Sequence, residues 1–248
     1  MAQRGLLVAA GIAAFLIFLS AMVPARLLTR FAPPGITVAG LDGTIWSGRA
    51  SSVRLQGRDL GAASWSCSPW RLLILEWSCR MAMQPAGGQL SVALSGEFDS
   101  DEIEACNLRG NLPITLLENV VTPAGWIGRL DLEVAKALIA GGLPQDAQGR
   151  IFVRNLKAPG PGGAILGDFE LTLGEGAVGS SSLTGRLNDL GGPLQVRGTI
   201  ELKRDRSYLV SGEVAPGPGA GPAIFETLSV LGPADSAGRR PFSLEGTL

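Results

Sequence analysis

Residues 89–98 read QLSVALSGEF, and this stretch decides how the chain is expected to fold. Its leucines and valine alternate with polar or small residues, which places the apolar side chains on one face of a β-strand and the others on the opposite face. The same alternation returns in residues 168–173 and 194–197, whereas long helical periodicity is scarce. The sequence therefore predicts a mainly β protein, with a mostly antiparallel sheet and a few short helices. The best helical segments are residues 114–121, 133–140 and 224–230.

Glycine recurs inside this pattern. The motif apolar–x–Gly–x–apolar occurs nine times, against about four matches expected from composition alone. Because strand side chains alternate, the glycine and its apolar flanks point to one face, and each glycine leaves a gap there. These gaps predict a strongly curved sheet; the alternative places the glycines at strand ends and turns. The nine stretches are Leu41–Ile45, Leu94–Phe98, Leu108–Leu112, Trp126–Leu130, Ile165–Phe169, Leu183–Leu187, Val196–Ile200, Val210–Val214 and Leu244–Leu248.

The composition argues against most enzyme classes and against nucleic-acid binding. Hydrophobic residues make up 46% of the chain and charged residues 17%, which supports a folded core. The net charge of −1 offers no basic surface for DNA or RNA, and the absence of histidine removes the commonest acid–base and metal-binding chemistry. We expect no catalytic residue, no metal and no cofactor. The single acidic cluster, Asp99, Asp101, Glu102 and Glu104, lacks calcium-loop spacing and is interpreted as a solvated turn.

The first residues predict a membrane anchor. Residues Gly5–Val23 form nineteen consecutive uncharged positions, long enough as a helix to cross a hydrocarbon core. A cleaved signal peptide is the competing interpretation, and a buried core helix is a weaker one. The arginines on either side do not settle the orientation. The predicted organisation is a cytoplasmic segment over residues 1–4, a transmembrane helix over 5–23, a linker over 24–34 and a β-rich domain over 35–248.

Two of the three cysteines occupy similar surroundings. Cys67 and Cys79 each follow a Trp-Ser pair, and Ser-Pro between them signals a turn. If the two stretches are antiparallel strands, cross-strand pairing brings the thiols within disulfide range. A disulfide there, with Cys106 left as the odd thiol, would place the domain in an oxidising compartment. The alternative is three buried free cysteines.

Several motifs together resemble a known family, the type II secretion system protein N family. The most specific is a Gly-Thr-Ile-Trp-Ser-Gly signature, formed here by Gly43, Thr44, Ile45, Trp46, Ser47 and Gly48. We interpret Trp46 as a structural anchor or a surface contact, with the two glycines setting the backbone around it. The other matching stretches, in chain order, are residues 65–73, 166–169, 187–194 and 228–248.

This resemblance implies a short cytoplasmic N-terminus, one span of the bacterial inner membrane and a periplasmic domain without catalytic residues. It predicts an accessory or assembly subunit of the inner-membrane platform of the secretion system, whose partners are the other inner-membrane subunits. A second interpretation belongs to another class. A curved sheet with an apolar concave face is similar to the periplasmic domains of AsmA-like lipid-transfer proteins, which would hold lipid in an apolar groove. A hydrolase is disfavoured, because nothing supplies a base beside a nucleophile.

Overall fold

The computed structural model describes residues 22–30, 35–55, 57–118, 124–160, 163–174 and 182–247. The predicted cytoplasmic segment and residues 5–21 of the predicted anchor lie outside the described residues. Within the described ranges, no helix is long and apolar enough to cross a membrane. The part of the predicted linker that is described contains a short 3-10 helix, η1 (Ala25–Arg30).

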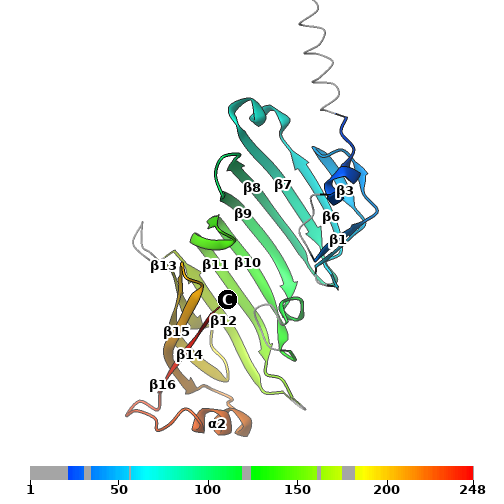
Figure 1. Ribbon diagram of the computed structural model, residues 1–248. Coiled ribbons are helices and arrows are strands. Elements are labelled where there is room, and N and C mark those ends of the chain that lie inside the picture. Colours follow the sequence, from blue (N-terminus) through cyan, green and yellow to red (C-terminus); the bar gives the residue numbers. More distant parts are fainter. Residues whose placement is uncertain are drawn as a thin grey trace, which may run out of the picture.

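The described chain is mainly β, as predicted (Figure 1). Thirteen strands form one antiparallel sheet in the order β16-β15-β14-β13-β12-β11-β10-β9-β8-β7-β6-β3-β2, and three short strands form a second sheet, β1-β4-β5. From β7 to β15, each strand pairs with the strands before and after it in the sequence. The strands are β1 (Ile36–Ala39), β2 (Asp42–Gly43), β3 (Ser47–Ala50), β4 (Ser52–Leu55), β5 (Arg58–Asp59), β6 (Ala62–Cys67), β7 (Glu76–Gln84), β8 (Gln89–Glu97), β9 (Glu102–Pro113), β10 (Ile127–Ala140), β11 (Leu143–Lys157), β12 (Ile165–Leu173), β13 (Ser182–Asp189), β14 (Leu194–Lys203), β15 (Ser207–Pro216) and β16 (Arg240–Thr247).

The alternation in residues 89–98 forms strand β8, and the register carries its apolar face across the sheet. Leu94 lies opposite Cys79 of β7 and Ala105 of β9. Ala105 in turn lies opposite Ala137 of β10, which lies opposite Ala147 of β11. Because directly opposed residues share a face, one side of the sheet is apolar from strand to strand. Bulges in β8–β9 and β10–β11 preserve this alignment where the alternation slips by one residue.

The helix predictions succeed only in part. Residues 133–140 lie in β10, so the predicted helix is wrong there. As a strand, the segment places Val134 and Ala137 on the apolar face, and its backbone forms hydrogen bonds with β9 and β11 on its two sides. These contacts outweigh the local helix propensity. The segment after β9 forms a short 3-10 helix, η3 (Ile114–Leu117), and residues 119–123 lie outside the described residues. The third segment is helical, as α2 (Pro222–Ser229). A further 3-10 helix, η2 (Pro69–Ile74), was not predicted.

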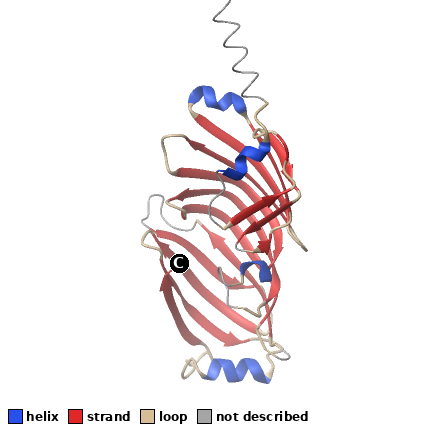
Figure 2. Ribbon diagram, turned by 45° about the vertical axis from the view of Figure 1, so that its right-hand side comes forward, coloured by secondary structure: helices blue, strands red, loops and turns tan. Residues whose placement is uncertain are grey.

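The prediction of a strongly curved sheet is wrong. The two edge strands, β2 and β16, do not pair, and the sheet is open and not strongly curled (Figure 2). The reason lies at the glycines, several of which sit inside strands as the motif suggested. At two of the motif glycines, Gly96 and Gly246, and also at Gly48, an aromatic ring from the directly opposed residue of the neighbouring strand fills the gap. The apolar side therefore needs no tight bend to close the gap at these positions. These pairs are Gly48 with Trp65, Gly96 with Trp77 and Gly246 with Tyr208.

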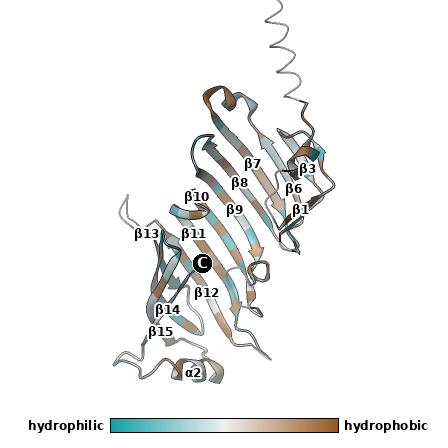
Figure 3. Cartoon of the chain, in the orientation of Figure 1, coloured by the Kyte–Doolittle hydropathy of each residue, from teal (hydrophilic) through white to brown (hydrophobic). Residues whose placement is uncertain are grey.

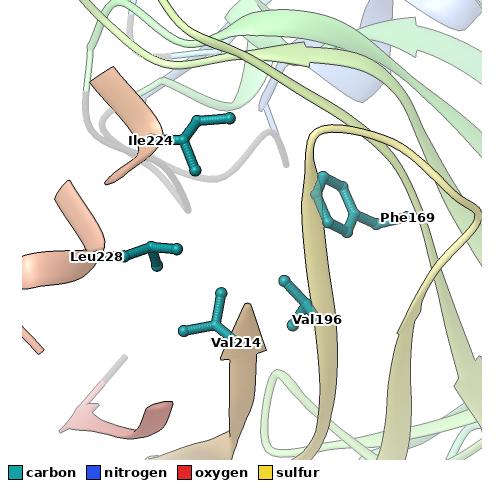
Figure 4. Close-up of a cluster of buried hydrophobic side chains, with 5 residues drawn as sticks. All are labelled: Phe169, Val196, Val214, Ile224 and Leu228. Carbon is teal, nitrogen blue, oxygen red and sulfur yellow. The ribbon is translucent and has the colours of Figure 1, made fainter. Parts of the chain in front are cut away.

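The most compact core of the described residues lies at the C-terminal end of the sheet. There α2 packs on the apolar side of β12, β14 and β15 (Figure 4). Ile224 and Leu228, one helical turn apart, are each only 3% exposed. They meet three buried side chains of the sheet, namely Phe169, Val196 and Val214. A second buried cluster of small side chains follows along β9–β11.

Candidate functional site: the apolar face of the sheet

The feature with the greatest functional potential is the apolar side of the large sheet, called the apolar face below. Its middle is the cluster of Ala105, Val134, Ala137 and Ala147. Half-buried leucines, valines and isoleucines surround this cluster, contributed by successive strands from β8 to β13: Val92, Leu94, Leu108, Ile139, Ile151, Leu173 and Leu183. Three of the four buried residues are alanines, whereas the larger apolar side chains around them are only half-buried.

The two ends of the apolar face are covered differently from its middle. At the C-terminal end α2 provides the cover. At the N-terminal end Trp65 of β6 donates its indole N–H to the carbonyl oxygens of Thr44 and Ile45, at 3.2 and 3.1 Å, which holds the turn before β3 against the sheet. Arg58 of the small sheet reaches the carbonyl oxygen of Thr115 in η3 at 3.2 Å. Between these ends, Val92 and Leu94 of β8 are only half-buried, and the main neighbours of β8 among the described elements are β7 and β9. An apolar surface is thus left accessible between two covers.

The opposite side of the sheet is polar and carries cross-strand ion pairs. Arg150 and Arg154 of β11 flank the ring of Phe152, with guanidinium carbons 5.5 and 4.9 Å from its centre. Each arginine also reaches carboxylates on both neighbouring strands, at 3.3–3.8 Å, namely Glu133, Asp131, Glu170 and Asp168. These side chains are solvated, so the pairs contribute little to stability. Their arrangement shows that this face is adapted to water, in contrast with the apolar face.

The Gly-Thr-Ile-Trp-Ser-Gly signature forms the tight turn between β2 and β3. Gly43 has a φ of +94°, a conformation that side chains rarely adopt. Thr44 donates its backbone N–H to Ser47 O at 2.8 Å, and Asp42 pairs with Arg49 at 2.8 Å across the hairpin. Trp46 is half-buried.

The turn joins two other parts of the chain. The N–H of Ile45 donates to Val23 O at 3.0 Å, and the N–H of Cys67 donates to Trp46 O at 2.6 Å. Gly48 lies directly opposite Trp65, and the indole ring leaves no space for a side chain at position 48. The signature thus ties the start of the described chain to the end of β6.

Cys67 and Cys79 lie directly opposite each other on β6 and β7 and form a disulfide, with an S–S distance of 2.03 Å. The bridge closes the base of the hairpin that carries η2. Cys106 is a free, half-buried thiol.

The interpretation of the acidic cluster as a turn is wrong for Glu102 and Glu104, which lie in β9. Lys136 pairs with Glu104 at 2.9 Å, and the Cys106 thiol donates to it at 3.3 Å. The hydrogen bond from Lys136, and then that from Cys106, hold the pKa of the Glu104 carboxyl below its usual value. Burial raises the pKa of the Cys106 thiol, and the hydrogen bond to Glu104 raises it further. Across the described ranges, no group of three or more metal-ligating side chains gathers.

Two features of the site were not anticipated from the sequence. The first is the pairing of glycines with aromatic rings, whose signal is present as Gly48, Gly96 and Gly246 but whose partners depend on strand register. The second is the cluster of exposed apolar side chains in η2. The run Leu72–Leu75 signalled it, but only the structure shows that these side chains point into solvent.

Comparison with known proteins identifies the family. A family model described as type II secretion system (T2SS), protein N, matches residues 34–243, which include every strand of the large sheet except the second half of β16. The chain belongs to the type II secretion system protein N family. It is 31% identical to the type II secretion system protein N of Aeromonas hydrophila, over 100% of both chains. It is 28% identical to the protein of that name from Vibrio cholerae serotype O1, over 87% of this chain and 86% of that one. No solved structure matches the chain.

Family membership makes this protein a component of the type II secretion system, in agreement with the resemblance seen in the sequence. The match covers both the signature turn and the strands that build the apolar face. The face is therefore part of the family's matched region rather than an addition to it.

Proposed function

We propose that this protein is a non-enzymatic accessory subunit of the inner-membrane part of the type II secretion system. Its partners are other inner-membrane subunits, which it contacts through the apolar face. The observation that carries the proposal is that half-buried apolar side chains continue over successive strands from β8 to β13, between two covered ends of the face. Extended apolar surface of this kind is unusual on a protein that acts alone and is typical of binding sites.

The topology that accompanies this proposal follows the sequence. Residues 1–4 lie in the cytoplasm, residues 5–23 cross the inner membrane, residues 24–34 form a linker, and residues 35–248 form a periplasmic domain. The uncharged run Gly5–Val23 supports the span, and the disulfide between Cys67 and Cys79 is compatible with the oxidising periplasm.

The apolar face suits a partner that brings its own apolar surface. Each 100 Å² of apolar area removed from water stabilises a complex by about 2.5 kcal/mol before the cost of association is subtracted. Because the strands of the face are already paired on both sides, a partner would dock through side chains rather than by adding a strand between them.

A second candidate function is supported by the same surface. Acyl chains need no hydrogen-bond partner, and the face offers few polar groups in its middle. The protein would then act as an AsmA-like lipid-binding or lipid-transfer module. In its favour, the accessible apolar surface continues over successive strands from β8 to β13 instead of forming one small patch at an edge.

A photo-crosslinking experiment separates the two candidates. Leu132 and Glu133 are neighbours on β10 whose side chains lie on opposite faces of the sheet; Glu133 pairs with Arg150 on the polar side, while Leu132 lies opposite Gly110 and Ile151. Each is replaced in turn by p-benzoylphenylalanine in the full chain. The protein is irradiated in cells that carry the secretion system, purified in mild detergent and analysed by mass spectrometry.

Crosslinks from position 132 to an inner-membrane secretion subunit, absent from position 133, are the expected result. Crosslinks from position 132 to phospholipid would replace the first candidate with the second. If position 132 captures neither, or if both positions capture the same subunit equally, the apolar face is not the working surface and the proposal fails.

A further inference from the structure

Exposed apolar side chains gather at one end of the sheet, in the hairpin between β6 and β7 and the adjoining turn after β8. Trp70, Leu73, Ile74 and Leu75 are 72%, 81%, 64% and 71% exposed, and Phe98 is 62% exposed. We call these five residues the apolar tip. Figure 3 shows the hairpin segment as one of the strongly hydrophobic parts of the cartoon. Leaving five large apolar side chains this exposed is unfavourable unless something other than water meets them.

The backbone of the tip is held in place. Leu75 has a left-handed backbone, with a φ of 60°, and its N–H donates to Leu72 O at 3.1 Å. The N–H of Phe98 donates to Leu75 O at 3.2 Å, which ties the two parts of the tip together. The disulfide between Cys67 and Cys79 closes the base of the hairpin. The outward side chains are therefore presented by a braced structure.

The tip lies at the end of the sheet where the described chain begins. Val23 O accepts the N–H of Ile45, and the next residue, Trp46, accepts at its carbonyl the N–H of Cys67, from which the hairpin starts. Two hydrogen bonds therefore connect Val23 to the base of the tip. Figures 1 and 2, which differ by a rotation about the vertical axis, both place η2 at the same height as the start of the described chain.

We propose that the apolar tip inserts into the interface of the lipid bilayer that residues Gly5–Val23 enter. Twenty-one residues precede Met22, and the uncharged run ends at Val23, beside the tip. A bilayer that takes up this run lies against the same end of the sheet. Tryptophan and leucine are residues that enter the interfacial zone, where the ring and alkyl groups leave water.

The charges around the tip define the kind of lipid surface it fits. Glu97 and Asp99 flank Phe98 and are exposed, while Arg71 is paired with Glu76 at 3.0 Å. This acidic margin disfavours an anionic surface, so insertion relies on apolar contact and a zwitterionic headgroup layer. Added salt should therefore leave binding of the tip unchanged.

This inference goes beyond the proposed function, because it holds whether the apolar face receives a protein or acyl chains. It does rest on the proposed membrane anchor. Exposure alone is not the criterion, since Val230 at the opposite end of the sheet, after α2, is 85% exposed. The position of the tip beside Val23 is what distinguishes it, and Val230 is the matched control.

The test uses the full chain with Cys106→Ser, carrying either Leu73→Cys or Val230→Cys, labelled with the environment-sensitive fluorophore NBD while the native disulfide is kept oxidised. Both positions are exposed, so neither label disturbs packing. Each protein is reconstituted into phosphatidylcholine vesicles with or without nitroxide-labelled lipid, and flotation first measures whether the chain is bound. The expected result is a blue-shifted emission that nitroxide lipid quenches at position 73, with neither effect at position 230.

Three outcomes would overturn the inference. If the chain floats with the vesicles but the label at position 73 stays in water, the anchor proposal survives and the tip is left as a surface for a protein. If both labels are quenched alike, the molecule lies on the bilayer without a preferred end. If the chain does not float at all, the proposed anchor fails together with the tip.

Discussion

Truncating Leu228 is predicted to release α2 from the apolar face. Leu228 and Ile224 are the only buried residues of α2, and both pack on Phe169, Val196 and Val214. An eight-residue helix is too short to be stable without such packing. We therefore expect Leu228→Ala to open the C-terminal cover locally before it unfolds the sheet.

The magnitude follows from the burial of the side chain. Leu228 is 3% exposed, so the substitution removes three carbon atoms that are almost fully out of water. At about 0.8 kcal/mol each this costs about 2.4 kcal/mol, and the cavity left behind raises the range to about 2–5 kcal/mol. A loss of about 2.4 kcal/mol alone increases the population of the undocked helix roughly 60-fold.

Hydrogen exchange followed by mass spectrometry measures the local opening of α2 directly. The amides of residues 222–229 should exchange faster in Leu228→Ala, while those of β9 and β10 keep their protection. Phe225→Ala is the matched control on the same helix, because Phe225 is 52% exposed and its truncation should cost less than about 0.5 kcal/mol. The reasoning is refuted if Leu228→Ala leaves exchange in α2 unchanged, or if Phe225→Ala accelerates it equally.

Three further predictions address other parts of the structure. Replacing Cys67 and Cys79 by serine should lower the free energy of unfolding by about 3 kcal/mol, because the unfolded chain regains the conformational entropy that the closed loop removes; urea titration measures this loss, and an unchanged midpoint would contradict the bridge. Glu104→Gln should remove a negative charge that raises the pKa of the Cys106 thiol, so the pH dependence of alkylation of this thiol by iodoacetamide should move to lower pH; no movement would show that the charge of Glu104 does not influence this pKa. Gly96→Val should destabilise the sheet by about 1–3 kcal/mol in thermal unfolding, because a Cβ there would lie 2.9 Å from the facing indole nitrogen, and equal stability would refute the ring-filling argument.

Local sequence carries much of the strand structure, because side-chain direction alternates along a strand whatever lies beside it. The alternation in residues 89–98 therefore identified β8 and its apolar side without knowledge of any neighbour. The similar Trp-Ser-Cys stretches likewise suggested which two cysteines could meet. The prediction from local pattern is wrong at residues 133–140. The spacing of apolar residues there is compatible with a helix, but pairing with β9 and β11 makes the segment a strand.

At the candidate site, too, the sequence shows which residues are apolar, and only the folded chain shows how they are covered. The apolar residues of the face were visible in the sequence, but the sequence gives no means of deciding what covers them, since cover depends on contacts between distant segments. The signature turn was recognised as a motif, whereas its hydrogen bonds to Val23 and Cys67 exist only in the folded chain.

Glycine illustrates the boundary most clearly. The sequence by itself determined that the recurring glycines and their apolar flanks share one face, because the period of a strand is two. Only the tertiary structure decided what the gaps become. Register places Trp77 and Tyr208 directly opposite two of these glycines, Gly96 and Gly246, and places Trp65 opposite Gly48. The three rings take up the space that a curling sheet would otherwise have closed. Register is set by the packing of the whole sheet, so no local stretch could reveal it.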